Sequence, residues 1–266
     1  MAKAIKNICK TTCFCFGVFS ALFLFAYSPC SFAQTSCGNH TESAKIPYDP
    51  ELPLGGAAKY ERVFDVNNSP YYQDIDFYHK KSTGSLTLIE HFKTIQQATE
   101  VTCGPACVLM VLEHFGKRNG LNEKQLQELR GTGQDTTYLR HLLNIFDATG
   151  GFEYQSTFNY KTASPATISE TFFLEYMQQG IPVIVGTDAW GGHWQIIIGY
   201  DSMGTDATAD DVLILADPYD TTDHNQDGYI TFPLQHFYSG TWRNHYDPDF
   251  GWGLFVAAHP VEYDDR

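Results

Sequence analysis

The sequence predicts an α+β fold, with helices first and an antiparallel sheet after them. From about residue 103 to residue 179, apolar residues recur at helical spacing, and from residue 182 onward they form short runs separated by Gly- and Asp-rich turns. Because helices and strands are segregated along the chain, a parallel sheet with alternating helices is not expected. The 266 residues are 43% hydrophobic and 18% charged. This suffices for one full-sized core or two small ones, and it excludes a disordered, collagen-like or coiled-coil chain.

The charge balance is acidic. Lys and Arg number 17 against 31 Asp and Glu, which gives a net charge of −14 at pH 7. A surface of this sign is repelled by nucleic-acid phosphates and by anionic lipids. No basic run in the sequence offsets this. We therefore expect no nucleic-acid partner and no membrane insertion of the chain once a signal segment is removed. The sequence carries no sign of the oligomeric state.

The first 33 residues have the pattern of a signal peptide. Three lysines lie within the first ten residues, residues 13–27 are largely apolar, and Ser-Phe-Ala at 31–33 places small residues where a signal peptidase cleaves. The predicted mature chain starts at Gln34 and is exported, to the periplasm or outside the cell. An uncleaved N-terminal segment that anchors the protein is the alternative.

Residues 34–85 predict an irregular N-terminal extension, and residues 86–266 the main domain. The extension is rich in Pro, Gly, Asn and Tyr and lacks a sustained helical period. An aromatic cluster in its second half suggests that this half packs against the main domain, whereas a cleavable pro-segment is the alternative. The cluster consists of Tyr71, Tyr72, Phe77 and Tyr78.

The helix at 103–115 is the most clearly delimited element of the main domain. It is almost entirely apolar, with Pro105 in its first turn and Gly116 as its C-terminal stop. Further helices are predicted at 123–128, 137–147 and 168–179, and strands at 182–185, 193–200, 212–216 and 252–258, while residues 86–92 form a strand or an entry segment.

A free cysteine is expected in the mature chain. Four of the seven cysteines precede residue 34, which leaves Cys37, Cys103 and Cys107. An odd number of cysteines in an exported protein leaves at least one thiol unpaired. Cys103 begins the helix at 103–115, and the positive end of a helix stabilises a thiolate. Taken alone, however, buried cysteines are usually just small hydrophobic residues.

Two strand ends supply the partners that a thiolate nucleophile needs. His193 opens the strand at 193–200, and Asp217 follows the strand at 212–216. If these strands pair antiparallel, the start of the first lies opposite the end of the second, and His193 and Asp217 become neighbours. This predicts a nucleophile, a base and a carboxylate that orients the base. Each residue alone also has a structural interpretation, because Asp before a proline is common in turns.

A glutamine completes the predicted site. Gln97 precedes Cys103 by six residues, so its side-chain amide could join the Cys103 backbone N–H in binding an oxyanion. The neighbouring residue Gln96 is the alternative candidate for this oxyanion-binding role. Aromatic residues near the proposed site would line a surface that binds peptides. They are Trp190, Trp194 and Tyr219.

The sequence around these residues resembles papain-like cysteine peptidases of the bacteriocin-processing type. The similarity spans about residues 90–258, in the family's order, and the resemblance implies a papain-like fold in which the nucleophile lies at the N-terminus of a central helix packed against an antiparallel sheet. Four segments carry it, namely Gln97-Ala-Thr-Glu-Val-Thr-Cys103-Gly-Pro-Ala-Cys107, Gly180-Ile-Pro-Val-Ile-Val185, Gly192-His193-Trp-Gln-Ile-Ile-Ile-Gly-Tyr-Asp201 and Ala216-Asp217-Pro218.

The resemblance also implies the role of each residue. Cys103 would be the nucleophile, His193 the general base and acid, Asp217 the group that orients the histidine, and Gln97 part of the oxyanion hole. The substrate would be a peptide or protein, hydrolysed through an acyl-enzyme, and no cofactor is required. Pairing of Cys37 with Cys107 would leave Cys103 as the single free cysteine.

The sequence departs from the family's namesakes, which cut leader peptides at a double glycine as part of a transporter inside the cell. It shows no transporter segment and no nucleotide-binding loop, so the resemblance implies a stand-alone domain. A weaker similarity, at 92–94 and 212–215, is to phytochelatin synthase, which transfers a γ-glutamylcysteine unit. An acyltransferase of this kind is one alternative function. A catalytically silent peptide-binding module on the same fold is a second, and an anchored structural protein is a third.

One segment matches part of a calcium-binding loop. Asp223, Asn225 and Asp227 occupy its first three ligand positions, followed by Gly228 at the sharp turn. The twelfth position is Leu234, where such loops carry a bidentate Glu. Two interpretations stay open, an Asx-rich turn or a weak structural Ca²⁺ site in a calcium-rich compartment.

Overall fold

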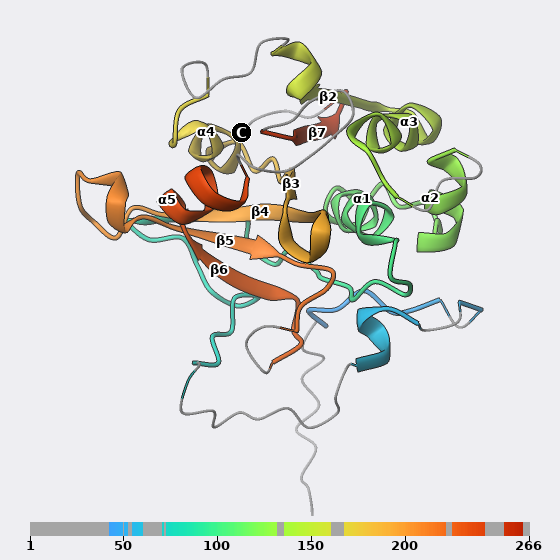
Figure 1. Cartoon of the computed structure of the whole chain (residues 1–266), viewed down its shortest axis with the longest axis horizontal. Coiled ribbons are helices and arrows are strands. Elements are labelled where there is room, and N and C mark those ends of the chain that lie inside the picture. The colour runs from blue at the N-terminus through green and yellow to red at the C-terminus, as the bar shows by residue number, and fades with distance from the viewer. Residues whose placement is uncertain are drawn as a thin grey trace, which may run out of the picture. The chain divides into compact units, whose positions relative to one another are not determined.

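Most of the chain after residue 42 is described by the structure, a computed structural model (Figure 1). The described residues are 43–49, 51–52, 55–60, 71, 73–131, 136–160, 168–221, 225–242 and 253–262. They all belong to the second of two units into which the chain divides, residues 42–266. The predicted signal peptide, Cys37, Tyr72 and Asp223 lie outside the described residues. Within those ranges, no helix combines the length and the apolar character needed to cross a membrane.

An antiparallel sheet of seven strands carries the other elements. Six of its strands follow one another in a single path, and the seventh joins the path at β4. The order is β2 (Phe152–Ser156), β7 (Phe255–Pro260), β3 (Val183–Thr187), β4 (His193–Asp201), β5 (Val212–Ala216) and β6 (Tyr229–Pro233), with β1 (Leu86–Leu88) paired to β4.

Strand β4 is the hub of this sheet. Its first half pairs with β3, its second half pairs with β1, and β5 lies along its other edge. The register between β4 and β5 shifts at a bulge between Ile197 and Gly199. A side chain at Gly199 would come within 2.8 Å of the Leu88 side chain, so only glycine fits where β1 and β5 converge on the bulge.

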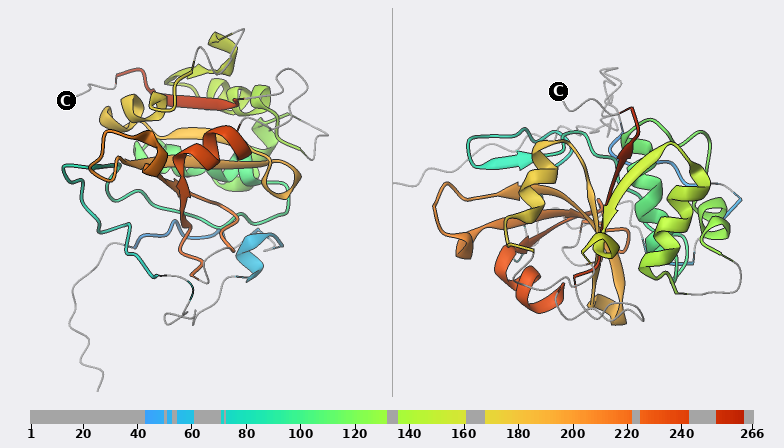
Figure 2. Two further views of the ribbon diagram at one scale, coloured as in Figure 1. Left: turned by 60° about the vertical axis from the view of Figure 1, so that its left-hand side comes forward. Right: turned by 90° about the horizontal axis from the view of Figure 1, so that it is seen from above.

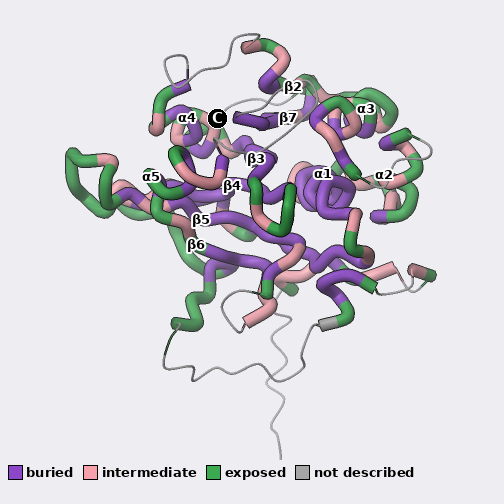
Figure 3. The backbone as a smooth tube through the Cα atoms, viewed as in Figure 1, coloured by how far each residue is buried: buried purple, intermediate pink, exposed green. Residues whose placement is uncertain are grey.

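Helices cover both faces of the sheet. Figure 2 (right) shows α1, α2 and α3 on one side and α4 and α5 on the other. Helix α1 is buried from its first residue to Leu112, and it appears with β4 and β5 as the continuous purple centre of Figure 3. The helices are α1 (Cys103–His114), α2 (Glu123–Leu129), α3 (Leu139–Thr149), α4 (Phe172–Gln178) and the short α5 (Leu234–His236).

The α+β prediction is confirmed, because helices precede most of the sheet and its strand pairs are all antiparallel. Helix α3 starts two residues later than predicted. The Thr137 carbonyl accepts a hydrogen bond from Trp194 Nε1 (2.6 Å), and Tyr138 has extended backbone angles. Thr137 is therefore held by the sheet and not by the helix.

Two strands are missing from the prediction, β2 and β6, which end the strand order on either side. An outer strand buries less of its surface, so its sequence carries a weaker apolar pattern. In β2 (FEYQS) only the last residue is fully buried. Strand β6 coincides with the end of the calcium-loop pattern, and its Pro233 needs no hydrogen-bonding partner at a sheet edge.

Part of the predicted extension packs against the sheet domain. Phe77 and Tyr78 are buried, as the aromatic cluster predicted, whereas Tyr71 is exposed. Ile46 is also buried, and its N–H donates to the Thr94 carbonyl (2.8 Å). The contact of Ile46 with Thr94 thus ties the extension to the segment that precedes α1 in the sequence.

Candidate active site

Cys103 is the first residue of α1, where the helix lacks a side-chain cap. The hydroxyl of the preceding residue, Thr102, donates to the Thr99 carbonyl (3.3 Å) and not to the helix. The first N–H groups of a helix have no partner within it, so those of Cys103 and Gly104 are directed outward beside the thiol. The residue as a whole is only 9% exposed. Cys103 is therefore largely buried at a helix end whose first backbone N–H groups have no partner within the helix.

Gly104 allows another segment to cross the first turn of α1. A Cβ atom at Gly104 would lie 2.4 Å from the Thr137 side chain. Thr137 Oγ1 accepts a hydrogen bond from Arg130 Nη1 (2.8 Å), and the same Nη1 donates to the Val101 carbonyl (3.1 Å). The start of α1, the end of α2 and the residues before α3 are thus locked together next to the thiol.

The strands bring His193 and Asp217 together as their order predicted. The last pair in the β4–β5 ladder is Ile196 opposite Ala216. One position further along, Gln195 on β4 therefore lies opposite Asp217. His193 lies two residues further along, on the same face of β4. Its Nε2 is 2.6 Å from Asp217 Oδ1. The Cys103 thiol also interacts with this ring and raises the pKa of His193. Because Nε2 faces Asp217, Nδ1 is the ring nitrogen left for the thiol.

Asp217 is buried but well supplied with donors. Besides His193, the Tyr219 backbone N–H donates to Oδ1 (2.7 Å) and Gln195 Nε2 donates to Oδ2 (2.7 Å). Thr187 Oγ1 in turn donates to Gln195 Oε1 (3.3 Å). Gln195 was not among the predicted site residues. Its spacing of two from His193 on one strand is the signal that could have found it, since such residues share a face.

The electrostatics of the pair favour the ion pair over the neutral groups. Burial alone would lower the pKa of His193, but the Asp217 carboxylate and the Cys103 thiol raise the pKa of His193 to about 10. Burial would raise the pKa of Asp217, whereas the charge and hydrogen bond of His193 hold the pKa of Asp217 below its usual value. The pairing therefore favours the imidazolium form of His193 beside an ionised carboxylate.

The two neighbouring glutamines have different contacts. Gln97 Nε2 donates to the Thr99 carbonyl (2.7 Å), and within the described residues its buried Oε1 has no hydrogen-bond partner. Gln96 instead binds the loop after β5. Its Nε2 donates to the Asp217 carbonyl (3.3 Å), and its Oε1 accepts a hydrogen bond from the Asp220 N–H (3.1 Å). Gln96 thus supports the Asp217 loop, while Gln97 keeps one amide hydrogen for another acceptor.

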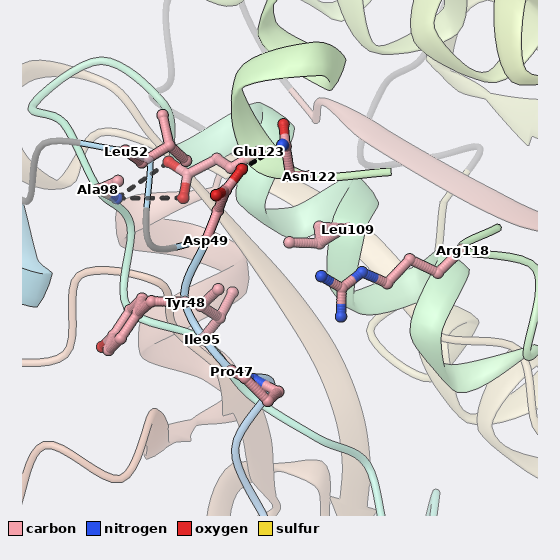
Figure 4. Close-up of a pocket in the computed structure, with 10 residues that line it drawn as sticks. All are labelled: Pro47, Tyr48, Asp49, Leu52, Ile95, Ala98, Leu109, Arg118, Asn122 and Glu123. Atoms are coloured by element: carbon pink, nitrogen blue, oxygen red, sulfur yellow. Dashed lines mark hydrogen bonds between the residues drawn. The ribbon is translucent and has the colours of Figure 1, made fainter. Parts of the chain in front are cut away.

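Glu123, at the start of α2, holds the segment between Gln97 and Cys103. Its buried carboxylate accepts the Ala98 N–H at 3.0 and 3.2 Å. The Thr102 side chain interacts favourably with the ionised form of this carboxylate. Figure 4 shows both bonds to Ala98 beside a cavity of about 10 Å³. Burial raises the pKa of Glu123 to about 7. The sequence shows Glu123 only as an acidic residue in a helix's first turn, so nothing marked it.

Two expectations for this region are wrong. The pairing of Cys37 with Cys107 is not formed, because Cys107 is a free and fully buried thiol that donates to the Trp194 carbonyl (3.3 Å). Burial raises the pKa of Cys107 well above its usual value, which makes it unreactive. Trp194 is also buried, with its Nε1 on Thr137, so it belongs to the core and not to a peptide-binding surface.

The calcium interpretation stays a prediction. Asn225 Nδ2 donates to Asp74 Oδ1 (2.8 Å) and to Asp227 Oδ2 (3.0 Å), and Asp227 Oδ1 accepts the Tyr229 N–H (2.9 Å). In the described part of the chain, no group of three or more His, Cys, Asp or Glu side chains could hold a metal ion. The first predicted ligand, Asp223, is outside that part.

Known proteins share parts of this sequence and fold. A sequence model of the Peptidase_C39-like family matches residues 89–248, more than half of the chain. Eight chains of solved structures also match. Among them is the peptidase domain of Streptococcus ComA, a bifunctional ABC transporter involved in a quorum-sensing pathway. It is 18% identical with a TM-score of 0.39, and the match covers 64% of this chain and 99% of that one. No curated protein matches the chain.

Proposed function

Because the chain belongs to the Peptidase_C39-like family and has its papain-like fold, we propose that it is a cysteine peptidase that cleaves peptide bonds through an acyl-enzyme. One observation supports this most directly. His193 binds the buried Asp217 carboxylate through Nε2 (2.6 Å), and the Cys103 thiol at the start of α1 is close enough to raise the pKa of the same imidazole. A nucleophile, a base and an orienting group in contact are what covalent acyl transfer requires.

Acylation is the first half of the proposed reaction. The Cys103 thiolate attacks the carbonyl carbon of the scissile bond, and negative charge develops on the carbonyl oxygen. The Cys103 N–H and the second hydrogen of Gln97 Nε2 bind this oxyanion. The imidazolium of His193, favoured by Asp217, donates its Nδ1 proton to the leaving nitrogen. The C–N bond breaks, the amine leaves, and a thioester remains on Cys103.

Deacylation reverses the proton transfer. Neutral His193 takes a proton from a water molecule as the water oxygen attacks the thioester carbonyl. The C–S bond breaks, the carboxylic acid product leaves, and the thiolate–imidazolium pair is restored. Asp217 keeps the histidine ring oriented in both halves, and Gln195 and the Tyr219 N–H keep Asp217 in place.

The proposal is tested by digesting a complex peptide mixture with the purified full chain and identifying new termini by mass spectrometry. We expect cleavage by the wild type and none by Cys103→Ala. Cys107→Ala is the matched control, because Cys107 is the other described cysteine and is buried away from reagents. Cleavage that persists in Cys103→Ala, or an acylated Cys103 that releases no product, would contradict a thiol peptidase.

We also propose that the protein is exported, on the evidence of its first 33 residues. Expression of the full chain in a bacterial host and mass spectrometry of the extracytoplasmic fraction test this. A mature N-terminus at Gln34 is expected. A chain that keeps its N-terminal segment and stays with the membrane would support the anchored alternative instead.

A further inference from the structure

Trp190 is exposed beside the proposed base. Among the three tryptophans that the structure describes, Trp190 is 67% exposed, whereas Trp194 is 2% and Trp242 0% exposed. A large apolar ring in water is unfavourable, and Trp190 is not isolated, because it packs against the Tyr219 ring beside the proposed base. Trp190 lies three residues before His193, in the connection between β3 and β4.

The backbone at Trp190 is strained in a way that displays the ring. Its φ of 54° and ψ of 20° lie in the left-handed region, which side chains other than Gly, Asn and Asp rarely adopt. Gly191 and Gly192 follow with φ of 80° and 126°. A bulky residue persists in such a conformation only where the surroundings or a function require it, and strain of this kind gathers at functional sites. The turn thus holds the indole outward at the start of β4.

Tyr219 joins this indole to the reactive groups. The ring centroids of Trp190 and Tyr219 are 5.6 Å apart, and the Tyr219 ring lies edge-on to His193 at 6.4 Å. The Tyr219 hydroxyl donates to Glu100 Oε2 (3.1 Å), and its N–H donates to Asp217. The tyrosine is therefore fixed at both ends. Trp190 and Tyr219 form one aromatic surface, here called the aromatic shelf, that starts at the base and extends to solvent.

The charges around the aromatic shelf select among its ligands. Glu100 accepts the hydrogen bond of the Tyr219 hydroxyl at one end of the shelf. Asp188 lies in the same turn as Trp190, because its carbonyl accepts the N–H of Gly191. Both carboxylates are on exposed residues. An acidic side chain on the shelf would meet like charges. A neutral apolar or aromatic side chain can instead stack on the exposed indole.

We propose that the aromatic shelf binds an apolar side chain of the substrate residue on the leaving-group side of the scissile bond. The proposal rests on the proposed peptidase function. A general acid must reach the leaving nitrogen, so the shelf, which begins at His193, borders the space where that nitrogen departs. The residue that carries the nitrogen then has its side chain within reach of Tyr219 and Trp190.

The same surface can be probed in the reverse direction, with an amine in place of water. The amine nitrogen attacks the thioester carbonyl, its proton passes to His193, the C–S bond breaks, and an amide and the Cys103 thiolate result. An amine that binds the shelf has a higher local concentration at the thioester than one that does not. Its share of the product therefore measures binding on the leaving-group side without knowledge of the natural substrate.

The experiment acylates the purified full chain with the p-nitrophenyl ester of N-acetylglycine and adds phenylalaninamide, alaninamide or glutamic acid α-amide. We expect phenylalaninamide to capture the acyl group about tenfold better than alaninamide, and the acidic amine worst. Trp190→Ala should remove the preference for phenylalaninamide, measured as the ratio of the two amide products and therefore independent of the acylation rate, and Trp190→Phe should restore most of it. Met203→Ala is the matched control, because Met203 is also exposed (54%) with a φ of 53° but lies in the turn after β4.

The outcomes separate the two proposals. A wild-type protein that is not acylated overturns the peptidase function, and the shelf proposal with it. A wild-type protein that is acylated but does not prefer phenylalaninamide overturns the shelf alone. A preference that survives in Trp190→Ala with an unchanged melting temperature does the same, because the indole would then not be the binding surface.

Discussion

Glu123 is a residue with no covalent role that sets the geometry of the proposed oxyanion hole. The two expected donors are Gln97 and the backbone N–H of Cys103. Glu123 accepts the N–H of Ala98, which follows the first donor, on both carboxylate oxygens. It also interacts with the side chain of Thr102, which precedes the second donor. A carboxylate can accept both bonds at once because it has two oxygens and only acceptor sites. Glu123 is thus a positioning residue for both donors.

Replacing Glu123 with Gln should slow acylation and leave thiol reactivity intact. The amide has one acceptor oxygen, so the Ala98–Thr102 segment loses one of its ties and the donors shift. We expect acylation of Cys103 by p-nitrophenyl acetate to fall about tenfold or more. Alkylation by iodoacetamide should keep its rate, because displacement at carbon develops no oxyanion. Both rates are measured by stopped-flow absorbance and mass spectrometry.

Glu128→Gln is the control for this change, because Glu128 lies on the same helix and is exposed. It should alter neither rate. If Glu123→Gln slowed alkylation and acylation equally, the residue would serve overall stability and not the oxyanion hole. An unaltered acylation rate would remove it from the site altogether.

The meeting of Cys103, His193 and Asp217 could be predicted because each stands at the end of a regular element, and the antiparallel register fixes which ends meet. The role of Glu123 and the contacts that fix Tyr219 could not be predicted. Their contacts join loops whose course no local pattern determines, such as the bond from Tyr219 to Glu100. Side-chain roles that depend on loop paths are decided by tertiary packing.

At the scale of elements, the packing of α1 against the residues before α3 decides where the thiol lies. Gly104 lets Thr137 approach the helix, and Thr137 in turn holds Trp194, the neighbour of His193. Cys107, one turn further along α1, donates to the Trp194 carbonyl. Helix α1 and strand β4 are therefore joined at two points, so the distance between thiol and imidazole is a property of the fold.

Gly104→Ala should strain this junction. The added methyl would overlap the Thr137 side chain, which is buried and hydrogen-bonded to Arg130. We expect a loss of about 1–3 kcal/mol in the free energy of unfolding, measured in urea, together with reduced activity. Gly84→Ala is the control, because nothing lies within 4 Å of a Cβ there. Equal stability of the two variants would show that Thr137 does not pack as described.

The elements themselves were predictable in proportion to their burial. Helix α1 and strand β5 are almost wholly apolar, and the sequence places them within a residue of their true bounds. The outer strands β2 and β6 bury little and were missed. Strand β6 was also hidden by its overlap with the calcium-loop pattern, where turn residues at the start of a strand resemble ligand positions.

For the whole molecule, the buried pair of His193 and Asp217 links stability to pH. In the folded state, burial lowers the pKa of His193, but the Asp217 carboxylate outweighs burial and raises this pKa from 6.5 to about 10. The unfolded state loses this proton near pH 6.5, so the stabilisation is complete below pH 6.5 and is lost as the pH rises toward 10.

The difference in unfolding free energy between the wild type and His193→Gln should therefore shrink between pH 6.5 and 10, by at least about 1 kcal/mol. Urea denaturation at half-unit pH steps measures it, and taking the difference removes the titration of the other groups. A difference that stays constant over this range would mean that His193 is neutral in the folded protein at pH 7.

The activated thiol is the central claim, and alkylation of Cys103 tests it most directly. Wild type and His193→Ala are treated with iodoacetamide from pH 5 to 9, and each labelled cysteine is located by mass spectrometry. We predict rapid labelling of Cys103 at pH 6, slower labelling at that pH in His193→Ala, and no labelling of Cys107 in the folded protein. Slow labelling of Cys103 at pH 6 in the wild type, or a rate that does not depend on His193, would contradict the account.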